Sequence, residues 1–195
     1  MTSDSQDPAF ADERPTLRTK RLVLRPYVMA DAPAVQRFAG AREIAATTET
    51  IPHPYGPGVA EEWIGKHARN FALRKTLSLA VTLASTGQYI GSMGLPLMRE
   101  DYEHAELGYW IAKEYWNNGY CTEAARAMLR FGFTQLKLHR IFAHHFINNP
   151  ASGRVLKKIG MKYEGRMREH VKKWGKFIDI DCYAILRSEA DLSED

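Results

Sequence analysis

The chain has 195 residues, of which 45% are hydrophobic, 11% aromatic and 26% charged, and its net charge is +4. This length and composition are those of an ordinary globular protein of one domain, and they exclude a disordered or fibrous chain. Because 23 acidic residues are interspersed with 27 basic ones, we expect no nucleic-acid partner, which would need clustered lysine and arginine.

The cysteines and the N-terminal residues bear on metal content and compartment. Cys121 and Cys182 lie far apart, without a second cysteine or a histidine at metal-ligand spacing, so we expect no disulfide and no metal. Residues 1–12 lack the basic start and apolar core of a signal peptide, and no apolar run approaches membrane-spanning length. These features favour a cytoplasmic protein without a membrane partner.

The chain shows no internal repeat and no low-complexity linker. We therefore expect one domain over residues 17–188. Flexible tails are expected at residues 1–16 and 189–195.

The first half of the chain shows two helix patterns between its first and second strand patterns. The Pro and Gly content of Ile51 to Gly58 predicts a rigid loop, and Ser85, Thr86 and Gly87 predict a hairpin turn. The elements expected here are strands at Arg21 to Tyr27, Leu77 to Leu83 and Gln88 to Leu97, and helices at Met29 to Gly40 and Ala60 to Arg74.

In the second half strands and helices alternate, and the chain ends in a hairpin. The expected strands are Ala105 to Ile111, Arg140 to Phe146, Met161 to Met167 and Phe177 to Leu186, and the expected helices are Thr122 to Leu136 and Ala151 to Ile159. This order predicts an α/β fold of the α+β kind, with a mixed, mostly antiparallel sheet and helices on both faces.

A candidate anion site lies between a strand and a helix. Asn117, Asn118 and Gly119 form a turn, and Thr122 with Glu123 opens the helix that follows. A helix N-terminus has unpaired N–H groups and a positive dipole end, so amides folded over it can hold a pyrophosphate. The alternative is a tight turn with Thr122 as an ordinary N-cap.

A second candidate, Asn149 with Pro150 and Ser152, stands at the start of a helix. Helix capping alone explains these residue types.

The chain resembles the GNAT acetyltransferases, and within them the branch similar to ribosomal-protein N-terminal acetyltransferases of the RimJ/RimL type. The matching blocks occur in family order over Leu17 to Arg187, which makes the combination highly specific. They are Leu22 to Tyr27, the Pro54-Tyr55 loop before Glu61 to Ile64, Glu106 to Trp110 (ELGYW), Trp116 to Ala124 (WNNGYCTEA), Leu138 to Ile141, Asn149 to Ser152 (NPAS) and Leu156 to Gly165.

The resemblance implies a GNAT fold of about seven strands in which the fourth and fifth strands splay apart. Ala105 to Ile111 and Arg140 to Phe146 would be those strands, and the pantetheine arm of acetyl-CoA would lie between them. The implied cofactor-binding residues are Ile111, Asn117, Asn118, Gly119, Tyr120, Cys121, Thr122, Asn149 and Ser152. The chain departs from the general family pattern at Trp116 and Cys121, although Trp116 agrees with the narrower branch.

The chemistry implied is direct attack of an amine on the thioester of acetyl-CoA in a ternary complex. Glu106 is the candidate base, with a structural carboxylate as the alternative, and Ser152 is the candidate that protonates the departing thiolate. Backbone N–H groups near Ile111 would stabilise the oxyanion. For Cys121 a packed thiol is favoured over a nucleophile, because no base partner can be assigned.

The acceptor is expected to be a primary amine, either a protein N-terminus or a small molecule. Tyr55, Trp63, Tyr102 and Trp174 are candidate lining residues of its cleft, or ordinary packing residues. Two other hypotheses remain: a non-catalytic acetyl-CoA-binding module, and a nucleic-acid-binding protein that uses Arg166 to Lys176. The expected state is a monomer or homodimer.

Overall fold

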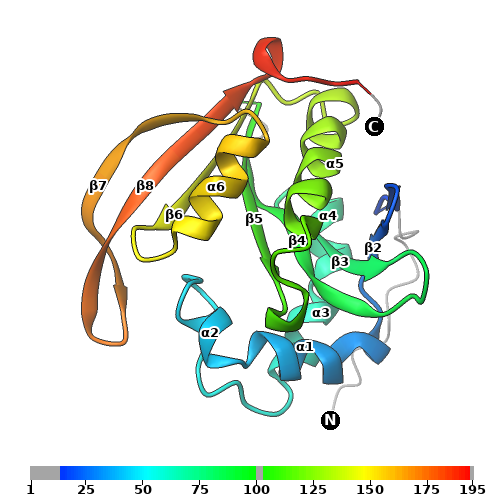
Figure 1. Ribbon diagram of the computed structural model, residues 1–195. Coiled ribbons are helices and arrows are strands. Elements are labelled where there is room, and N and C mark those ends of the chain that lie inside the picture. The colour runs from blue at the N-terminus through cyan, green and yellow to red at the C-terminus, as the bar shows by residue number, and fades with distance from the viewer. Residues whose placement is uncertain (1–13, 100–102, 194–195) are drawn as a thin grey trace.

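A computed structural model describes residues 14–99 and 103–193 of the chain. Within these residues, eight strands form one sheet in the order β1-β2-β3-β4-β5-β6-β8-β7, and neighbours pair antiparallel except the parallel pair β5 and β6 (Figure 1). The strands are β1 Leu17–Arg18, β2 Leu22–Pro26, β3 Leu77–Leu83, β4 Tyr89–Arg99, β5 His104–Ile111, β6 Arg140–Phe146, β7 Lys162–Lys173 and β8 Lys176–Leu186.

The predicted mixed, mostly antiparallel sheet is confirmed, with eight strands in place of about seven. The additional strand is β1, whose two residues pair with Leu24 and Val23 of β2. Two residues are too few to show a period in the sequence. Most of the N-terminal tail, residues 1–13, and residues 194–195 lie outside the described residues.

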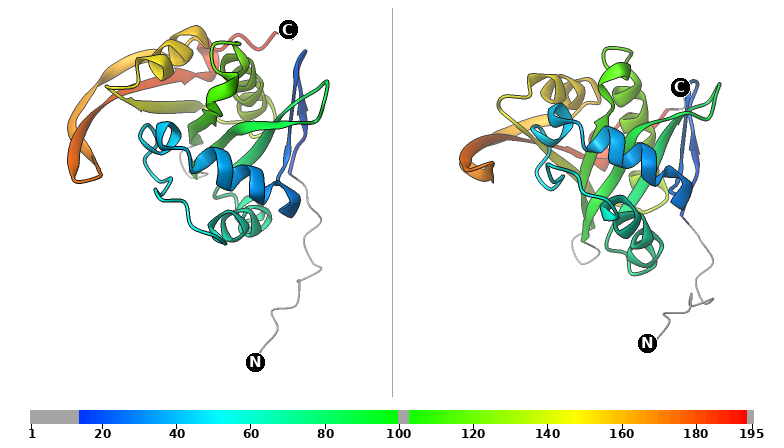
Figure 2. Two further views of the ribbon diagram at one scale, coloured as in Figure 1. Left: turned by 60° about the horizontal axis from the view of Figure 1, so that its bottom comes forward. Right: turned by 90° about the horizontal axis from the view of Figure 1, so that it is seen from below.

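Helices cover both faces of the sheet, as expected (Figures 1 and 2). On one face α5 and α6 pack on a core that includes Leu107, Ile141 and Leu156. On the other face α1 and α3 pack on a second core around Tyr27, Ala80 and Tyr89. The helices are α1 Ala32–Ala39, α2 Arg42–Ala45, α3 Val59–Gly65, α4 His67–Ala72, α5 Tyr120–Thr134 and α6 Pro150–Lys158.

Two helix predictions need correction. The predicted helix Ala60 to Arg74 is divided into α3 and α4 at Lys66. The helix predicted to begin at Thr122 begins two residues earlier, at Tyr120, because Gly119 with φ of 80° is its N-cap. A glycine adopts this left-handed conformation at little cost, so it ends the loop and starts the helix.

Helix α5 lies close to the sheet because small residues face the strands. A Cβ atom added to Gly132 would lie 2.8 Å from Cδ1 of Ile141 on β6. Ala124 and Ala125 are fully buried in the same interface. This tight packing fixes the N-terminus of α5 relative to β5 and β6.

Strands β5 and β6 pair only near their beginnings. The register runs from His104 opposite Arg140 to Glu106 opposite Phe142. Beyond that point β5 stays paired with β4 as far as Ile111, while β6 stays paired with β8. The facing edges of β5 and β6 therefore separate after Glu106, which is the predicted splay.

The β7–β8 hairpin projects from the body of the protein (Figure 2), and Lys173 near its tip contacts the segment between α2 and α3. Nζ of Lys173 donates hydrogen bonds to the carbonyl oxygens of Glu49 and Ile51, at 3.2 and 2.9 Å. Strand β7 extends six residues beyond the predicted end at Met167. Among the described residues, no helix has the length and apolar character needed to span a membrane.

Candidate active site

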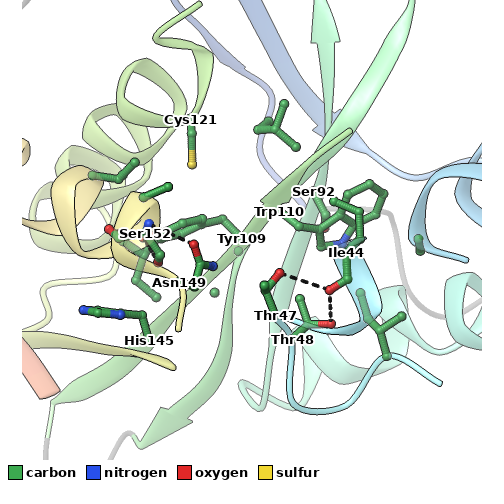
Figure 3. A pocket seen from close by; sticks show the side chains of 18 of the residues that line it. Ile44, Thr47, Thr48, Ser92, Tyr109, Trp110, Cys121, His145, Asn149 and Ser152 are labelled. Atoms are coloured by element: carbon green, nitrogen blue, oxygen red, sulfur yellow. Dashed lines mark hydrogen bonds between the residues drawn. The ribbon is translucent and has the colours of Figure 1, made fainter. Parts of the chain in front are cut away.

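A cavity of about 780 Å³ lies at the splay, and residues on both faces of the sheet line it. Figure 3 shows Cys121, Tyr109 and Ser152 on one side of it and Ile44, Thr47 and Thr48 on the other. The sequence-predicted residues that line this cavity are Glu106, Ile111, Asn117, Gly119, Tyr120, Cys121, Thr122, Asn149 and Ser152. The structure therefore brings these residues together, from three segments of the chain.

The loop before α5 is held by its own side chains. The indole Nε1 of Trp116 donates to the carbonyl of Ile111 at 2.6 Å. Nδ2 of Asn118 donates to the carbonyls of Tyr115 and Trp116, at 3.2 and 2.9 Å. Asn118 is the predicted binding residue that does not line the cavity, since its side chain is used to shape the loop.

The N-terminus of α5 carries no side-chain cap. The alternative in which Thr122 is the N-cap is therefore wrong, because Thr122 is the third residue of the helix. Asn117 and Gly119 adopt left-handed φ angles of 62° and 80°, which fold the loop over the helix start. The first N–H groups of a helix have no acceptor within it, so this end of α5 can bind an anion.

Arg21 lies beside the loop, and the sequence did not indicate it as a site residue. Its Nη1 donates to the carbonyl of Asn118 at 3.0 Å, and its guanidinium lies 4.7 Å from the centre of the Tyr120 ring. Its Nε donates to Glu123 at 2.7 Å. Burial raises the pKa of Glu123, but hydrogen bonds from Thr19 and Arg21 outweigh burial and leave that pKa lowered. Arg21 thus neutralises the one carboxylate in the first turn of α5.

Replacing Glu123 with Ala is expected to lower the free energy of unfolding by about 1–3 kcal/mol, because it leaves the donors of Thr19 and Arg21 without their charged acceptor. Urea unfolding measures the effect. Glu114, whose exposed pair with Arg37 spans 3.4 Å, is the control, and its replacement should change stability by less than about 1 kcal/mol. Equal losses in the two variants would contradict this account.

Two hydroxyl groups meet across the splay. The Ser152 Oγ lies 2.9 Å from the Tyr109 hydroxyl of β5, and the Asn149 side chain accepts the Ser152 N–H at 3.3 Å as the N-cap of α6. Burial raises the pKa of Tyr109 well above its ordinary value, so this phenol keeps its proton at neutral pH. Tyr109 belongs to the ELGYW block, but only the fold reveals its contact with Ser152.

Cys121 faces the same side of the cavity as Ser152 (Figure 3). Burial raises the pKa of its thiol to about 12. At neutral pH it stays protonated, which makes it a poor nucleophile. This supports the prediction that Cys121 is a packed thiol and not a nucleophile.

Glu106 lies where the strands part, and its partner is a histidine. The Nδ1 atom of His144 lies 3.2 Å from Oε1 of Glu106, and its Nε2 lies 3.4 Å from Oε2 of Glu49. Burial raises the pKa of Glu106, His144 lowers it and Glu49 raises it, so the pKa ends above its ordinary value. In the described part of the chain, no group of three or more His, Cys, Asp or Glu side chains is arranged to hold a metal ion.

The far side of the cavity is partly aromatic. Tyr55 and Trp63 line it as predicted, together with Trp110, which the sequence did not indicate. Trp174 instead packs outside, against His53 at a ring distance of 5.7 Å. The fourth predicted aromatic residue, at position 102, lies outside the described residues.

Residues 21–162 match the family model of the Acetyltransferase (GNAT) domain. This match covers most of the chain, so the chain belongs to the GNAT family and is an acetyl-CoA-dependent N-acetyltransferase. A relative, the uncharacterized N-acetyltransferase YoaA of Bacillus subtilis (strain 168), is 29% identical over 182 residues, covering 89% of this chain and 97% of its own.

Solved structures of acetyltransferases share the fold. RimL, a ribosomal L7/L12 alpha-N-protein acetyltransferase in complex with coenzyme A, has a TM-score of 0.82 at 14% identity, over 92% of this chain and 100% of its own. Spermidine N-acetyltransferase from Vibrio cholerae, in complex with CoA and spermine, has a TM-score of 0.75 at 23% identity, over 86% of this chain and 96% of its own. RimL belongs to the branch that the sequence blocks indicate.

Proposed function

We propose that this chain transfers the acetyl group of acetyl-CoA to a primary amine, on a protein N-terminus or a small molecule, within a domain spanning residues 17–188. The observation that carries the proposal is that one continuous cavity reaches both sides of the splay. It joins the uncapped N-terminus of α5 on one side to Glu106 on the other. A cofactor and an amine can therefore meet within it.

On the cofactor side, the amides from Asn117 to Thr122 would hold the pyrophosphate, with the charge of Arg21 beside them. The edge of β5 near Ile111 is separated from β6, so its backbone groups would pair with the pantetheine amides. Asn149 would provide a further hydrogen bond to that arm. These assignments use the free backbone edges that the splay creates.

On the acceptor side, Glu106 would take the proton of the amine, directly or through a water molecule. His144 contacts the carboxylate and so holds it in place. Ser152, whose hydroxyl lies 2.9 Å from that of Tyr109, would donate a proton to the departing thiolate, and the hydrogen-bonded pair would then regain one proton from solvent. Backbone N–H groups near Ile111 would stabilise the oxyanion.

The acceptors named for the two structural neighbours differ, since RimL is named for ribosomal L7/L12 and the Vibrio enzyme for spermidine. Both acceptors carry amines. The proposal therefore commits to a primary amine.

The test measures CoA thiol release from acetyl-CoA with a panel of small primary amines and N-terminal peptides. The proposal expects release that depends on both enzyme and amine, with one acetylated amine per thiol by mass spectrometry. Acetyl-CoA binding without release for any amine would favour the non-catalytic module. A monomer or homodimer remains the expected state, which sedimentation would check.

The contacts of Glu106 predict how the pH dependence of kcat/KM responds to its neighbours. The base acts as a carboxylate, so the rate rises as pH passes through the pKa of Glu106. His144→Asn removes a group that lowers this pKa, so the rise of kcat/KM on the acid side of the pH profile (the acid limb) should move to higher pH. Glu49→Gln removes a group that raises this pKa, so the acid limb should move to lower pH. Both shifts should be modest, because water screens the partly exposed partners.

The same acceptor in all assays keeps the amine's own titration constant. Shifts in one direction for both variants would contradict the assignment of the limb to Glu106.

A further inference from the structure

The cavity extends from the splay across the sheet, over a row of residues with little or no side chain. Ser78 of β3, Gly94 of β4 and Gly108 of β5 are direct neighbours in the sheet register, and all three line the cavity. Strands lie about 4.8 Å apart, so the row is about 10 Å long. We name this row, from Gly108 to Ser78, the trough.

The trough lies on the face that α1 and α3 cover. Successive strand residues point to opposite faces, and the neighbours Leu77, Leu95 and Leu107 all belong to the core on the α5 side. Gly108 therefore shares a face with Glu106 and Trp110, two residues away on either side. The trough starts beside the candidate base.

A larger residue at Gly94 or Gly108 would collide with neighbouring atoms unless these moved. A Cβ atom on Gly94 would lie 2.2 Å from the carbonyl oxygen of Leu77. One on Gly108 would lie 3.0 Å from Cγ of Pro96. Gly94 and Gly108 therefore place only backbone atoms at the floor of the trough, and the small side chain of Ser78 forms its far end.

The walls above this floor are mostly apolar. Trp110 stands at one side, and α3 contributes Trp63 and Val59. Other apolar residues that line the cavity are Val35, Ala39, Ile44, Ile51 and Tyr55, and Pro96 lies beside Gly108. Val35, Ala39 and Ile44 are already buried, whereas the side chains of Ile51, Tyr55, Val59, Trp63 and Trp110 are half-buried. An apolar ligand would cover this second group and remove its remaining surface from water.

Three hydroxyl groups near the trough form hydrogen bonds within the protein. Thr47 donates to the Glu43 carbonyl at 3.0 Å and Thr48 donates to the Ile44 carbonyl at 2.9 Å (Figure 3 draws the bonds to Ile44). The Ser92 hydroxyl forms a hydrogen bond with the Tyr27 hydroxyl. The carboxylates, Glu106 and Glu49, lie at the splay end, so the described lining between Gly108 and Ser78 carries no charge.

We propose that the acceptor is a primary amine joined to an uncharged, largely apolar or aromatic group, which lies in the trough while the amine faces Glu106. The proposal rests on the acetyltransferase function proposed above. A second ammonium group on the acceptor would lie in the trough without a counter-ion, and burying an unpaired charge is costly. Linear polyamines should therefore be poor acceptors.

The first experiment compares kcat/KM for pentylamine and cadaverine, which have the same five-carbon chain and differ by a terminal ammonium group. The proposal expects pentylamine to be better by at least about tenfold. Phenylethylamine and a short peptide that begins with Phe distinguish a small-molecule acceptor from a peptide. Equal rates for pentylamine and cadaverine, or faster acetylation of cadaverine, would overturn the proposal.

The second experiment fills the far end of the trough with Ser78→Leu and compares octylamine, whose chain is long enough to reach that end, with ethylamine, whose chain is not. The ratio of kcat/KM for the two amines should fall by about tenfold or more. Ser85→Leu places the same side chain in the exposed β3–β4 turn and should leave the ratio unchanged. Ser78→Val is the smaller substitution, suited to a strand, should the leucine variant misfold.

Failures of the two proposals are distinguishable. If no amine, ethylamine included, supports thiol release, the acetyltransferase function itself fails. If ethylamine is acetylated but neither the charge of the acceptor nor the residue at position 78 alters the ratios, only the trough proposal is overturned.

Discussion

Gly119→Trp is expected to weaken acetyl-CoA binding by at least about a hundredfold. Gly119 has φ of 80°, and a Cβ atom there would already lie 3.4 Å from Nη2 of Arg21. An indole at this position would cover the amides at the start of α5 and displace Arg21. Each hydrogen bond lost to a charged group costs about 1.5–3 kcal/mol, and 1.4 kcal/mol is about tenfold in Kd. Calorimetric titration of acetyl-CoA measures the loss.

Gly87→Trp is the matched control for that experiment. Gly87 also has a positive φ, 71°, but a Cβ atom there meets nothing within 4 Å, and it lies in the β3–β4 turn. Both variants carry the strain of tryptophan in a left-handed conformation. Retained binding in the Gly119 variant, or equal loss in both, would show that the loop before α5 is not the anion site.

Glu106→Gln should lower kcat by about a hundredfold to a thousandfold, which is the usual contribution of a positioned base. The amide keeps the shape of the side chain but cannot accept a proton from the amine. The Kd for acetyl-CoA should stay unchanged, because the cofactor loop lies on the other side of the splay. Steady-state kinetics and calorimetry on the same preparation measure both quantities.

A purely structural Glu106 would give a different result. Its loss would lower stability and change the Kd for acetyl-CoA while leaving the pH profile of the remaining activity intact. Glu164→Gln is the control: Glu164 forms an ion pair with Arg140 at 2.5 Å and lies outside the cavity. An unchanged kcat in the Glu106 variant would remove it from the mechanism.

Local sequence patterns predicted the regular part of the fold. The strands at Leu77–Leu83 and Arg140–Phe146 have the predicted bounds, because β-branched and apolar runs end there at clear turn or loop residues. Four-residue α2 and two-residue β1 were missed, since neither is long enough to show a period. Strand β7 was predicted too short because its charged end, typical of a protected edge strand, resembles a solvated surface segment.

The candidate site was predictable where one short segment forms it and not where distant segments meet. The loop around Gly119 could be found from its turn residues and the helix that follows. Arg21 and Glu123 are separated by 102 positions, and the contact of Tyr109 with Ser152 spans 43, so no local pattern indicates either. The bridge from Glu106 through His144 to Glu49 likewise depends on the register of β5 and β6.

The two hydrogen bonds from Lys173 to the carbonyls of Glu49 and Ile51 join the tip of the β7–β8 hairpin to the segment that bounds the acceptor side of the cavity. The position of the hairpin tip is therefore coupled to the position of this segment, although 122 positions separate Lys173 from Ile51. Divergence in acceptor choice among relatives should then appear as paired changes in these two segments. An engineer who transplants one of them into another acetyltransferase should transplant its partner as well.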